Sequence, residues 1–534
     1  MPETLVGGGS FVAAEVLEQA ARRRTFAIIS HPDAGKSTLT EALALHAGLI
    51  SEAGAIHGKA SRKSTVSDWT EMEKDRGISI TSAALQFEHR GCVINLLDTP
   101  GHADFSEDTY RVLAAVDCAV MLIDAAKGIE AQTLKLFEVC KHRGIPIITV
   151  VNKWDRPGAD ALELMDEIVA TIGMTPKPLN WPVGAAGDFR GVVDRDTGEF
   201  VRFTRTAGGA TIAPQTRMSP DAALAETGQV WAKAFEEHEL LDIDGANYDR
   251  SAFLAGTDTP VLFAAAALNF GVAQVLDVLI EKAPAPAAVA DADGEPRPLE
   301  SAFSAMVFKV QAGMNQAHRD RVAFARVCSG QFDRGMQLTD AGSGRTFATK
   351  YVHTVVGNQR HTIEYAFPGD VIGLVNAGSL RAGDTLYQND PVAFPQMPRF
   401  APEHFATARV RDRSRTKRFT KGIAALDHEG VVQVLMSDVR GEQTPVLAAV
   451  GPLQFEVAAH RMESDFNAEI VLDSLPYRLA RRVSPSHAAD VAAYPQVEVF
   501  ERSDGVLLAL FADKWRLQRV ERDLPDAGLE PLVG

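Results

Sequence analysis

The sequence predicts an α/β domain built on a mostly parallel sheet, followed by an antiparallel β-barrel domain and a ferredoxin-like α+β domain. Three observations predict this fold class. In the first half of the chain, short apolar runs alternate with amphipathic segments, as in a parallel sheet with helices on both faces. After a proline-rich stretch, short alternating runs recur between glycine-containing turns, which is typical of a small barrel. The last part follows the order β-α-β-β-α-β of a ferredoxin-like unit.

The composition is that of a globular protein with several domains. The chain has 534 residues, a formal net charge of −16, 46% hydrophobic residues and 23% charged residues, which excludes wholesale disorder. At roughly 100–200 residues per domain, the length predicts about three or four domains. The acidic balance argues against a general nucleic-acid binder, so we expect no DNA partner, although it leaves room for a local basic patch.

Targeting and redox features indicate a protein of the cytoplasm. The apolar stretches are short and broken by charges, so we expect no transmembrane helix and no membrane partner. The arginine run Arg22-Arg23-Arg24 follows the first apolar residues, which is the reverse of a signal peptide. The four cysteines are scattered without metal-ligand spacing and are expected to be reduced core residues.

The first predicted domain spans residues 1–283. Its strands carry Val, Ile or Leu on consecutive positions, as strands buried on both faces tend to do. The strands are predicted at residues 25–30, 92–98, 117–124, 145–152 and 260–266, and the helices at 36–47, 107–115, 132–143, 161–172 and 272–282. Between about residues 188 and 251 the pattern becomes irregular, which predicts an insertion.

Residues 284–299 are predicted to be a linker, because the run PAPAAVADADGEPRP contains four prolines and no periodicity. The barrel domain is predicted at residues 300–395 and the α+β domain, with a C-terminal extension, at 396–534. No internal repeat is evident. The last domain is predicted to contain strands at 405–410, 431–437, 444–451 and 468–474 and helices at 413–427 and 452–466.

A phosphate-binding loop is predicted where the first strand meets the first helix. The run SHPDAGKS fits the P-loop pattern G-x-x-x-x-G-K-[ST] except at its first position, where Ser30 replaces glycine. Gly35 allows the backbone turn that points N–H groups at phosphate oxygens, and Lys36 adds a positive charge. Alone, the run also fits an ordinary strand–turn–helix. The predicted nucleotide contacts here are Ser30, His31, Pro32, Asp33, Ala34, Gly35, Lys36, Ser37 and Thr38.

The second buried strand ends in the run DTPGH. A carboxylate at this position, Asp98, can hold Mg²⁺ through water, and Gly101 lets a backbone N–H approach a γ-phosphate. Taken alone, Asp followed by Pro-Gly is more often a plain turn. The predicted nucleotide contacts are Asp98, Thr99, Pro100, Gly101 and His102.

The fourth buried strand ends in Asn152, Lys153, Trp154 and Asp155. An ionised Asp155 can accept hydrogen bonds from the N1–H and 2-amino groups of guanine, a donor pair that adenine lacks. The Asn152 side chain is expected to contact the base and to help hold the loops. Because this motif follows the other two in order on successive strand ends, the sequence predicts binding of GTP and GDP.

These motifs carry a family resemblance. The runs SDWTEMEKDRGISIT, DTPGHADFSEDTYR and NKWD together resemble the translational GTPases. The runs SHPDAGKST, NFGVAQVLD, AHRDRVAFARVCSG and VGPLQFEV resemble the bacterial peptide chain release factor 3 family, from about residue 24 to about residue 473. The resemblance implies an α/β P-loop GTPase domain, a barrel and a third domain, in agreement with the organisation above.

The resemblance also implies residue roles. Ser37, Ser79 and, through water, Asp98 are implied to hold Mg²⁺, with Ser79 as the hydroxyl ligand of the first switch. His102 is implied to orient the attacking water when ribosomal RNA brings it into place, so that hydrolysis depends on the ribosome. A histidine beside the γ-phosphate can act in this way without being a strong base, because positioning and charge stabilisation dominate phosphoryl transfer.

The chain departs from the family pattern at several positions. Trp154 stands where leucine is usual, and Ala103 stands where glutamate is expected. Ala265 and Ala266 lie where the family has a Ser/Thr-Ala guanine loop, so the Ala266 N–H can meet guanine O6 but the supporting hydroxyl is missing. We expect these changes to alter the affinity for the nucleotide more than the choice of which nucleotide binds.

A basic segment interrupts the acidic chain between residues 409 and 421. It carries seven basic residues and one acidic residue, a composition that suits binding of RNA phosphates. The alternative is a solvated helix face paired with neighbouring acids. The candidate ribosomal RNA contacts are Arg413, Arg415, Lys417, Arg418 and Lys421.

The function implied by the resemblance is a ribosome-dependent GTPase of translation termination, acting as a monomer. It stimulates release of class-one release factors after peptide release, and it lacks the GGQ tripeptide with which those factors cut peptidyl-tRNA. An elongation factor G-like translocase or a ribosomal protection protein is an alternative, although about sixty residues after the third domain are too few for their further domains. Two more candidate functions are a nucleotide-binding scaffold with little hydrolysis and a P-loop kinase or ATPase, the latter disfavoured by Asn152 and Asp155.

Overall fold

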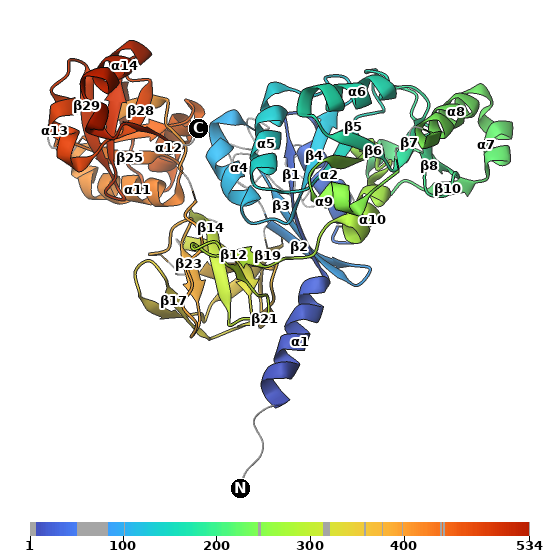
Figure 1. Cartoon of the computed structure of the whole chain (residues 1–534), viewed down its shortest axis with the longest axis horizontal. Coiled ribbons are helices and arrows are strands. Elements are labelled where there is room, and N and C mark those ends of the chain that lie inside the picture. The colour runs from blue at the N-terminus through green and yellow to red at the C-terminus, as the bar shows by residue number, and fades with distance from the viewer. Residues whose placement is uncertain are drawn as a thin grey trace, which may run out of the picture.

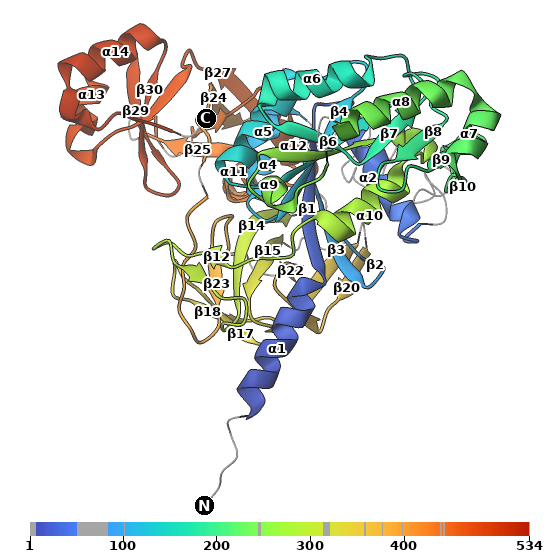
Figure 2. The ribbon, with the colours of Figure 1, turned by 45° about the vertical axis from the view of Figure 1, so that its right-hand side comes forward.

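The computed structural model describes residues 7–50, 84–100, 102–243, 247–312, 321–356, 359–375, 378–397, 399–437, 440–441 and 444–532. Along the chain they form the G domain, domain II and domain III, coloured from blue-green through yellow to red in Figure 1. Helix α1 (Gly7–Ala21) projects from the molecule beside domain II, as both Figures 1 and 2 show. Among the described helices, none has the length and apolar character needed to span a membrane.

The G domain is built on a seven-stranded sheet that confirms the predicted α/β class. The strand order is β2-β3-β1-β4-β5-β11-β6, and β2 runs antiparallel to β3 whereas the other pairs are parallel. A separate hydrophobic core lies on each face of the sheet. The strands are β1 (Arg23–Ser30), β2 (Ala84–His89), β3 (Cys92–Asp98), β4 (Cys118–Asp124), β5 (Ile147–Asn152), β6 (Thr175–Pro178) and β11 (Asp258–Phe263). The helices are α2 (Lys36–His46), α4 (Ser106–Leu113), α5 (Ala131–His142), α6 (Ala161–Ile172) and α10 (Val272–Lys282).

The segment predicted to be an insertion belongs to an ordered subdomain that begins at Asn180, before the predicted start near residue 188. Its four-stranded antiparallel sheet has the order β10-β9-β8-β7 and packs around the buried side chains of Trp181, Phe200 and Trp231. Each strand has only four residues, which is too short for a period of two to be evident. The elements are β7 (Asn180–Val183), β8 (Gly191–Asp194), β9 (Phe200–Phe203), β10 (Gln215–Met218), α7 (Pro220–Thr227), α8 (Gln229–Ile243) and α9 (Arg250–Leu254).

Domain II is a curled antiparallel sheet around one apolar core, as predicted for the barrel. Its order is β18-β17-β23-β14-β15-β22-β19-β20. The strands are β14 (Ser304–Ala312), β15 (Arg321–Ser329), β17 (Gln337–Asp340), β18 (Thr346–Ala348), β19 (Val352–Val356), β20 (Gln359–Thr362), β22 (Val371–Val375) and β23 (Thr385–Tyr387). Two small ladders accompany it: β12 (Val289–Ala290) with β13 (Pro296–Arg297) in the predicted linker, and β16 (Phe332–Asp333) with β21 (Tyr365–Ala366).

Domain III contains two ferredoxin-like units that share one eight-stranded sheet. The first unit is the predicted one, and its order β27-β24-β26-β25 is that of a split β-α-β fold. The second unit repeats this arrangement as β29-β30-β28-β31, and the two units join where β25 pairs antiparallel with β29. The first unit comprises β24 (His404–Val410), α11 (Thr416–Glu429), β25 (Gln433–Met436), β26 (Val446–Ala449), α12 (Leu453–Ser464) and β27 (Ile470–Ser474). The second comprises β28 (Leu479–Arg482), α13 (Ala488–Ala492), β29 (Val497–Arg502), β30 (Leu507–Phe511), α14 (Lys514–Asp523) and β31 (Glu530–Pro531).

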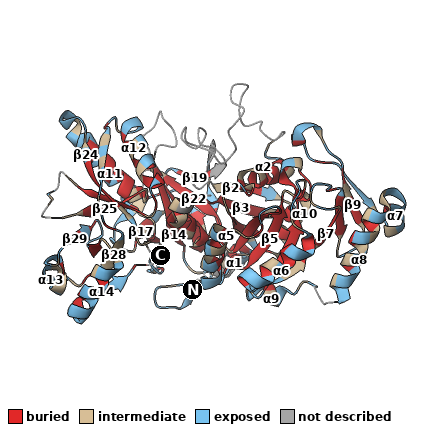
Figure 3. Ribbon diagram, turned by 90° about the horizontal axis from the view of Figure 1, so that it is seen from above, coloured by how far each residue is buried: buried red, intermediate tan, exposed pale blue. Residues whose placement is uncertain are grey.

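The structural repeat corrects the expectation that the chain has no internal repeat. Helix α13 has five residues, whereas α11, at the corresponding place in the first unit, has fourteen. Such different lengths remove the fixed sequence period by which repeats are recognised. The predicted C-terminal extension is therefore an integral half of domain III. Figure 3 shows buried residues concentrated in the strands and exposed ones on helices such as α14.

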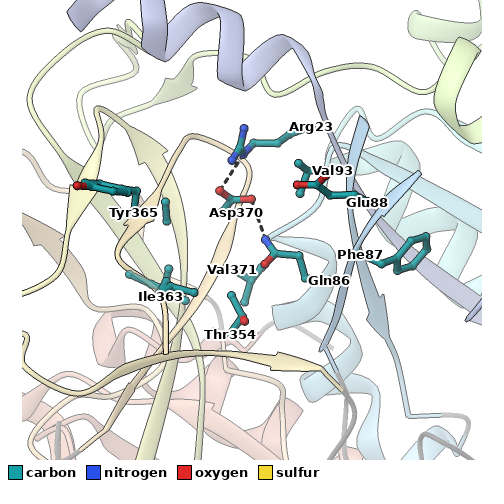
Figure 4. Close-up of a pocket in the computed structure, with 12 residues that line it drawn as sticks. Arg23, Gln86, Phe87, Glu88, Val93, Thr354, Ile363, Tyr365, Asp370 and Val371 are labelled. Carbon is teal, nitrogen blue, oxygen red and sulfur yellow. Dashed lines mark hydrogen bonds and ion pairs between the residues drawn. The ribbon is translucent and has the colours of Figure 1, made fainter. Parts of the chain in front are cut away.

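Buried polar contacts join the G domain to domain II. The Asp370 carboxylate accepts a hydrogen bond from Arg23 at 2.8 Å and another from Gln86 at 3.0 Å (Figure 4). The Thr25 hydroxyl donates to the Gly369 carbonyl at 2.7 Å. A cavity of about 260 Å³ lies beside these contacts. Because the Arg23 and Asp370 side chains are buried together, breaking the pair would leave an uncompensated charge.

Candidate functional site

The predicted nucleotide loops meet at one edge of the G-domain sheet. Ser30 ends β1, Asp98 ends β3 and Asn152 ends β5. These strands run parallel with their neighbours, so their carboxyl ends lie on the same side of the sheet. Ligands of open α/β sheets bind at this edge. The three motifs that are far apart in sequence therefore form one site.

The phosphate loop has the conformation that its sequence predicts. Gly35 caps α2 with φ of 102°, and a Cβ there would overlap the Asn152 amide, so both backbone angle and space require glycine. The Lys36 Nζ lies 2.6 Å from Asp98 Oδ1, and the two side chains are 7% and 1% exposed. The next motif is held against β1, because the Thr99 hydroxyl donates to the Ile28 carbonyl at 2.6 Å.

Asn152 connects the phosphate loop to the guanine loop. Its Nδ2 donates to the Ala34 carbonyl at 2.9 Å, and its Oδ1 accepts from the Ala266 N–H at 3.0 Å. The Ala266 N–H predicted for guanine O6 is thus engaged by Asn152 in this structure, so O6 would have to share it. Ala265 is fully buried and its N–H donates to the Phe270 carbonyl at 3.0 Å. Both alanines therefore shape the loop through their backbones.

Lys153 is held by two elements next to the predicted base site. Its φ is 64°, and its Nζ donates to the Asp33 carbonyl and to Asp124 Oδ2, the latter at 2.8 Å. Burial opposes ionisation of Asp124, but hydrogen bonds from Lys153 and the Ala126 N–H outweigh it and lower the pKa of the carboxyl. Asp124 was missed in the sequence analysis, although it ends the predicted strand 117–124 at the same edge as the other motifs.

The side chains of Trp154 and Asp155 are placed for different roles. The Trp154 indole is 2% exposed and packs edge-on against Phe263 with ring centres 4.9 Å apart, while its Nε1 donates to the Gly184 carbonyl at 3.1 Å. The Trp154 ring therefore lies in the hydrophobic core and supports the loop from there. Asp155 is half-buried, and within the described residues its carboxylate accepts no hydrogen bond. Its oxygens are thus available for a base.

His31 makes contacts to α5 that the sequence did not reveal. Its N–H donates to the Thr133 hydroxyl at 3.1 Å, and its Nε2 lies 3.2 Å from the Glu130 carboxylate. The Ser30 hydroxyl is buried without a hydrogen-bond partner among the described residues. The phosphate loop thus has a serine hydroxyl at the position where the strict P-loop pattern has glycine.

His102 is partly exposed just after β3. Its Nδ1 lies 3.2 Å from both the backbone N and the Oδ1 of Asp104, and its ring meets Phe105 edge-on at 6.4 Å. No sequence signal had pointed to Asp104. Gly101, Ser79 and the segment 64–81 lie outside the described residues, so their predicted roles remain predictions.

The basic segment of domain III divides into paired and unpaired residues. Arg409 donates to Asp473, Arg411 pairs with Glu469, and Arg415 donates to the Asn467 carbonyl at 2.6 Å. These three residues precede α11, and each has a neighbouring acid, Asp412 at 3.4 Å in the case of Arg415, so pairing with acids holds for them but not on a helix face. Four exposed candidates have side chains without a hydrogen-bond or ion-pair partner among the described residues: Arg413, Lys417, Arg418 and Lys421.

Three family models match consecutive parts of the chain. Residues 21–285 match the elongation factor Tu GTP binding domain, residues 302–389 match elongation factor G domain 2, and residues 394–521 match the class II release factor RF3 C-terminal domain. A crystal structure of a protein from Thermus thermophilus covers 90% of this chain and 72% of its own, with a TM-score of 0.68 and 22% identity. That similarity shows that the two chains share their overall fold.

Curated relatives match almost the whole chain. Peptide chain release factor 3 of Gloeobacter violaceus is 47% identical over 524 residues, which cover 96% of this chain and 97% of that protein. The same factor of Symbiobacterium thermophilum is 46% identical over 513 residues, which cover 95% and 97%. The chain is a GTPase of translation termination and belongs to the peptide chain release factor 3 family.

Proposed function

We propose that this chain is a ribosome-dependent GTPase that stimulates release of class-one release factors after the peptide has been freed. It does not hydrolyse peptidyl-tRNA itself, and it works as a monomer in the cytoplasm. The observation that carries the proposal is the bridge made by Asn152 between the phosphate and guanine loops, with His102 following the end of β3 at the same edge of the sheet. Membership of the release factor 3 family supports the assignment to termination.

The proposed hydrolysis relies on positioning and charge. Lys36 and the N–H groups at the start of α2 bind the β- and γ-phosphates. When the nucleotide binds, the Lys36 ammonium moves from the Asp98 carboxylate to the phosphates, because the same ammonium is the positive partner of both anions. His102 orients the attacking water, which adds to the γ-phosphorus as the bond to the β-phosphate oxygen breaks and GDP leaves.

Mg²⁺ fits the oxygen-bearing side chains of this site. The Asp98 carboxylate at the strand end is a hard oxygen ligand of the kind that Mg²⁺ prefers, and it is proposed to hold the ion through water. Ser37, in the first turn of α2, and Ser79 would supply hydroxyl oxygens. When bound, the ion neutralises charge on the phosphates. The buried contact of Asp98 with Lys36 fits this role, since a carboxylate here needs a positive partner.

The test of the proposed function is GTP hydrolysis with and without bacterial ribosomes. We expect strong stimulation of the wild type and a loss of roughly 100-fold or more in the His102→Ala variant, as for removal of a group that positions a reactant. GDP binding should not change, because His102 contacts no residue of the guanine loop. Wild type that binds GDP but is not stimulated by ribosomes would contradict the proposal and favour the scaffold alternative.

The four exposed basic residues of domain III are proposed to contact ribosomal RNA. We expect the double charge reversal Arg418→Glu and Lys421→Glu to weaken ribosome association. The slope of log affinity against log salt should fall by about 1 for each phosphate that the protein no longer neutralises. Sedimentation binding at several salt concentrations measures both quantities.

The matched control reverses two exposed arginines in the second unit of domain III, Arg519→Glu and Arg522→Glu, whose side chains are 65% and 75% exposed. Equal loss in both doubles would mean that only net charge matters. An unchanged salt slope in the first double would refute the proposed contact.

A further inference from the structure

Domain III reaches the segment that carries His102. The Asp104 Oδ2 accepts a hydrogen bond at 2.7 Å from the N–H of Leu453, the first residue of α12. Its Oδ1 lies 3.2 Å from His102 Nδ1. One carboxylate, 12% exposed, therefore touches both the histidine proposed to orient water and a helix of another domain.

The turn of domain III around Gly451 has room for the Asp104 carboxylate. A Cβ on Gly451 would overlap the Asp104 side chain, so only glycine leaves room for it. Gln454 fixes the turn, because its Oε1 accepts from the Val450 N–H at 2.7 Å and its Nε2 donates to the Val431 carbonyl at 2.9 Å. The N-terminus of α12 has no side-chain cap of its own, and a negative charge is favoured there.

An apolar contact holds the same two segments together. Phe105, next to Asp104, packs with Leu453 and Val457 of α12, and all three side chains are buried. Another edge-on ring contact joins Tyr110 of α4 to Phe400, with ring centres 5.5 Å apart. The position of Asp104 is thus fixed by contacts across the domain boundary.

The two contacts of His102 Nδ1 require opposite protonation of that atom. To accept from the Asp104 N–H, Nδ1 must carry a lone pair, whereas to donate to the carboxylate it must carry a proton. Both contacts come from Asp104, so this residue holds the Nδ1 side of the ring in either form. The Leu453 N–H in turn holds the Asp104 carboxylate in place.

We infer that Asp104 is a positioning residue, which orients His102 for hydrolysis and makes that orientation depend on the docking of domain III at Gly451 and Leu453. The inference rests on the proposed role of His102. Movement of domain III away from this contact would release Asp104 and leave His102 without its orienting partner. Hydrolysis would then respond to the position of a domain that does not touch the nucleotide.

The test is single-turnover GTP hydrolysis at saturating ribosomes. We expect Asp104→Ala and Gly451→Ala each to lower the rate about 10-fold while GDP affinity is unchanged. The double variant should be no slower than Asp104→Ala alone, because the added methyl group then meets no carboxylate. Gly378→Ala is the control, since a Cβ there meets no atom within 4 Å, and it should retain the wild-type rate.

A second comparison separates this inference from the proposed function. In a His102→Ala background, Asp104→Ala should have no further effect, because Asp104 acts through His102. Additive losses, or wild-type rates in both single variants, would overturn the inference even if His102→Ala is inactive. If ribosomes do not stimulate the wild type, the proposed function fails, and the same variants compared in ribosome-free turnover decide the inference.

Discussion

Replacing Lys36 by alanine is expected to abolish nucleotide binding and to destabilise the nucleotide-free protein. The Lys36 ammonium lies 2.6 Å from the Asp98 carboxylate, and both side chains are buried. Removal of one partner from a buried ion pair costs roughly 3–5 kcal/mol of unfolding free energy, and here the buried Asp98 carboxylate loses the ammonium that faces it. Loss of charge-assisted hydrogen bonds to the phosphates lowers affinity by about 100-fold or more. Urea unfolding and GDP titration measure the two effects.

A double variant separates the two roles of Lys36. In Lys36→Met with Asp98→Asn, the buried negative charge that faced Lys36 is removed as well, so much of the stability should return. Nucleotide binding should not return, because no cation faces the phosphates. If the single variant is as stable as the wild type, or if the double variant is no more stable than the single variant, the buried ion pair does not stabilise the protein as predicted.

Replacing Asp155 by asparagine is expected to change base preference from guanine to xanthine. The carboxylate of Asp155 is half-buried and, within the described residues, accepts no hydrogen bond, so the base is its predicted partner. An asparagine amide places a donor against the 2-amino group, and GDP affinity should fall roughly 100- to 1000-fold. Xanthine carries an oxygen at position 2, which accepts from the amide, so xanthosine diphosphate should bind better than GDP.

Thermal unfolding is the control for correct folding of the Asp155→Asn variant. Because Asp155 supports no other described residue, its thermal unfolding temperature in the absence of nucleotide should match that of the wild type. Competition between GDP, xanthosine diphosphate and ADP gives the base preference. An unchanged guanine preference would show that Asp155 does not contact the base, and stronger ADP binding would favour the kinase or ATPase alternative.

Much of the G domain could be predicted from local sequence. The predicted helix 161–172 and strand 92–98 have the observed bounds of α6 and β3. The predicted strand 260–266 extends three residues past the end of β11, because the chain leaves the sheet after Phe263 to form the predicted guanine loop. Alanines at 264–266 have the same apolar character in a strand as in a buried loop, so the pattern cannot mark this end.

The sequence by itself determined the family, the order of the domains and which residues stand at the strand ends of the predicted nucleotide site. These follow from short-range patterns, because a phosphate loop or a buried strand needs only neighbouring residues. Only the tertiary structure decided which basic residues remain unpaired, that the C-terminal extension repeats the ferredoxin-like unit, and that Asp104 caps α12. The contact between Asp104 and Leu453 joins residues 349 positions apart, so their proximity depends on how whole domains pack.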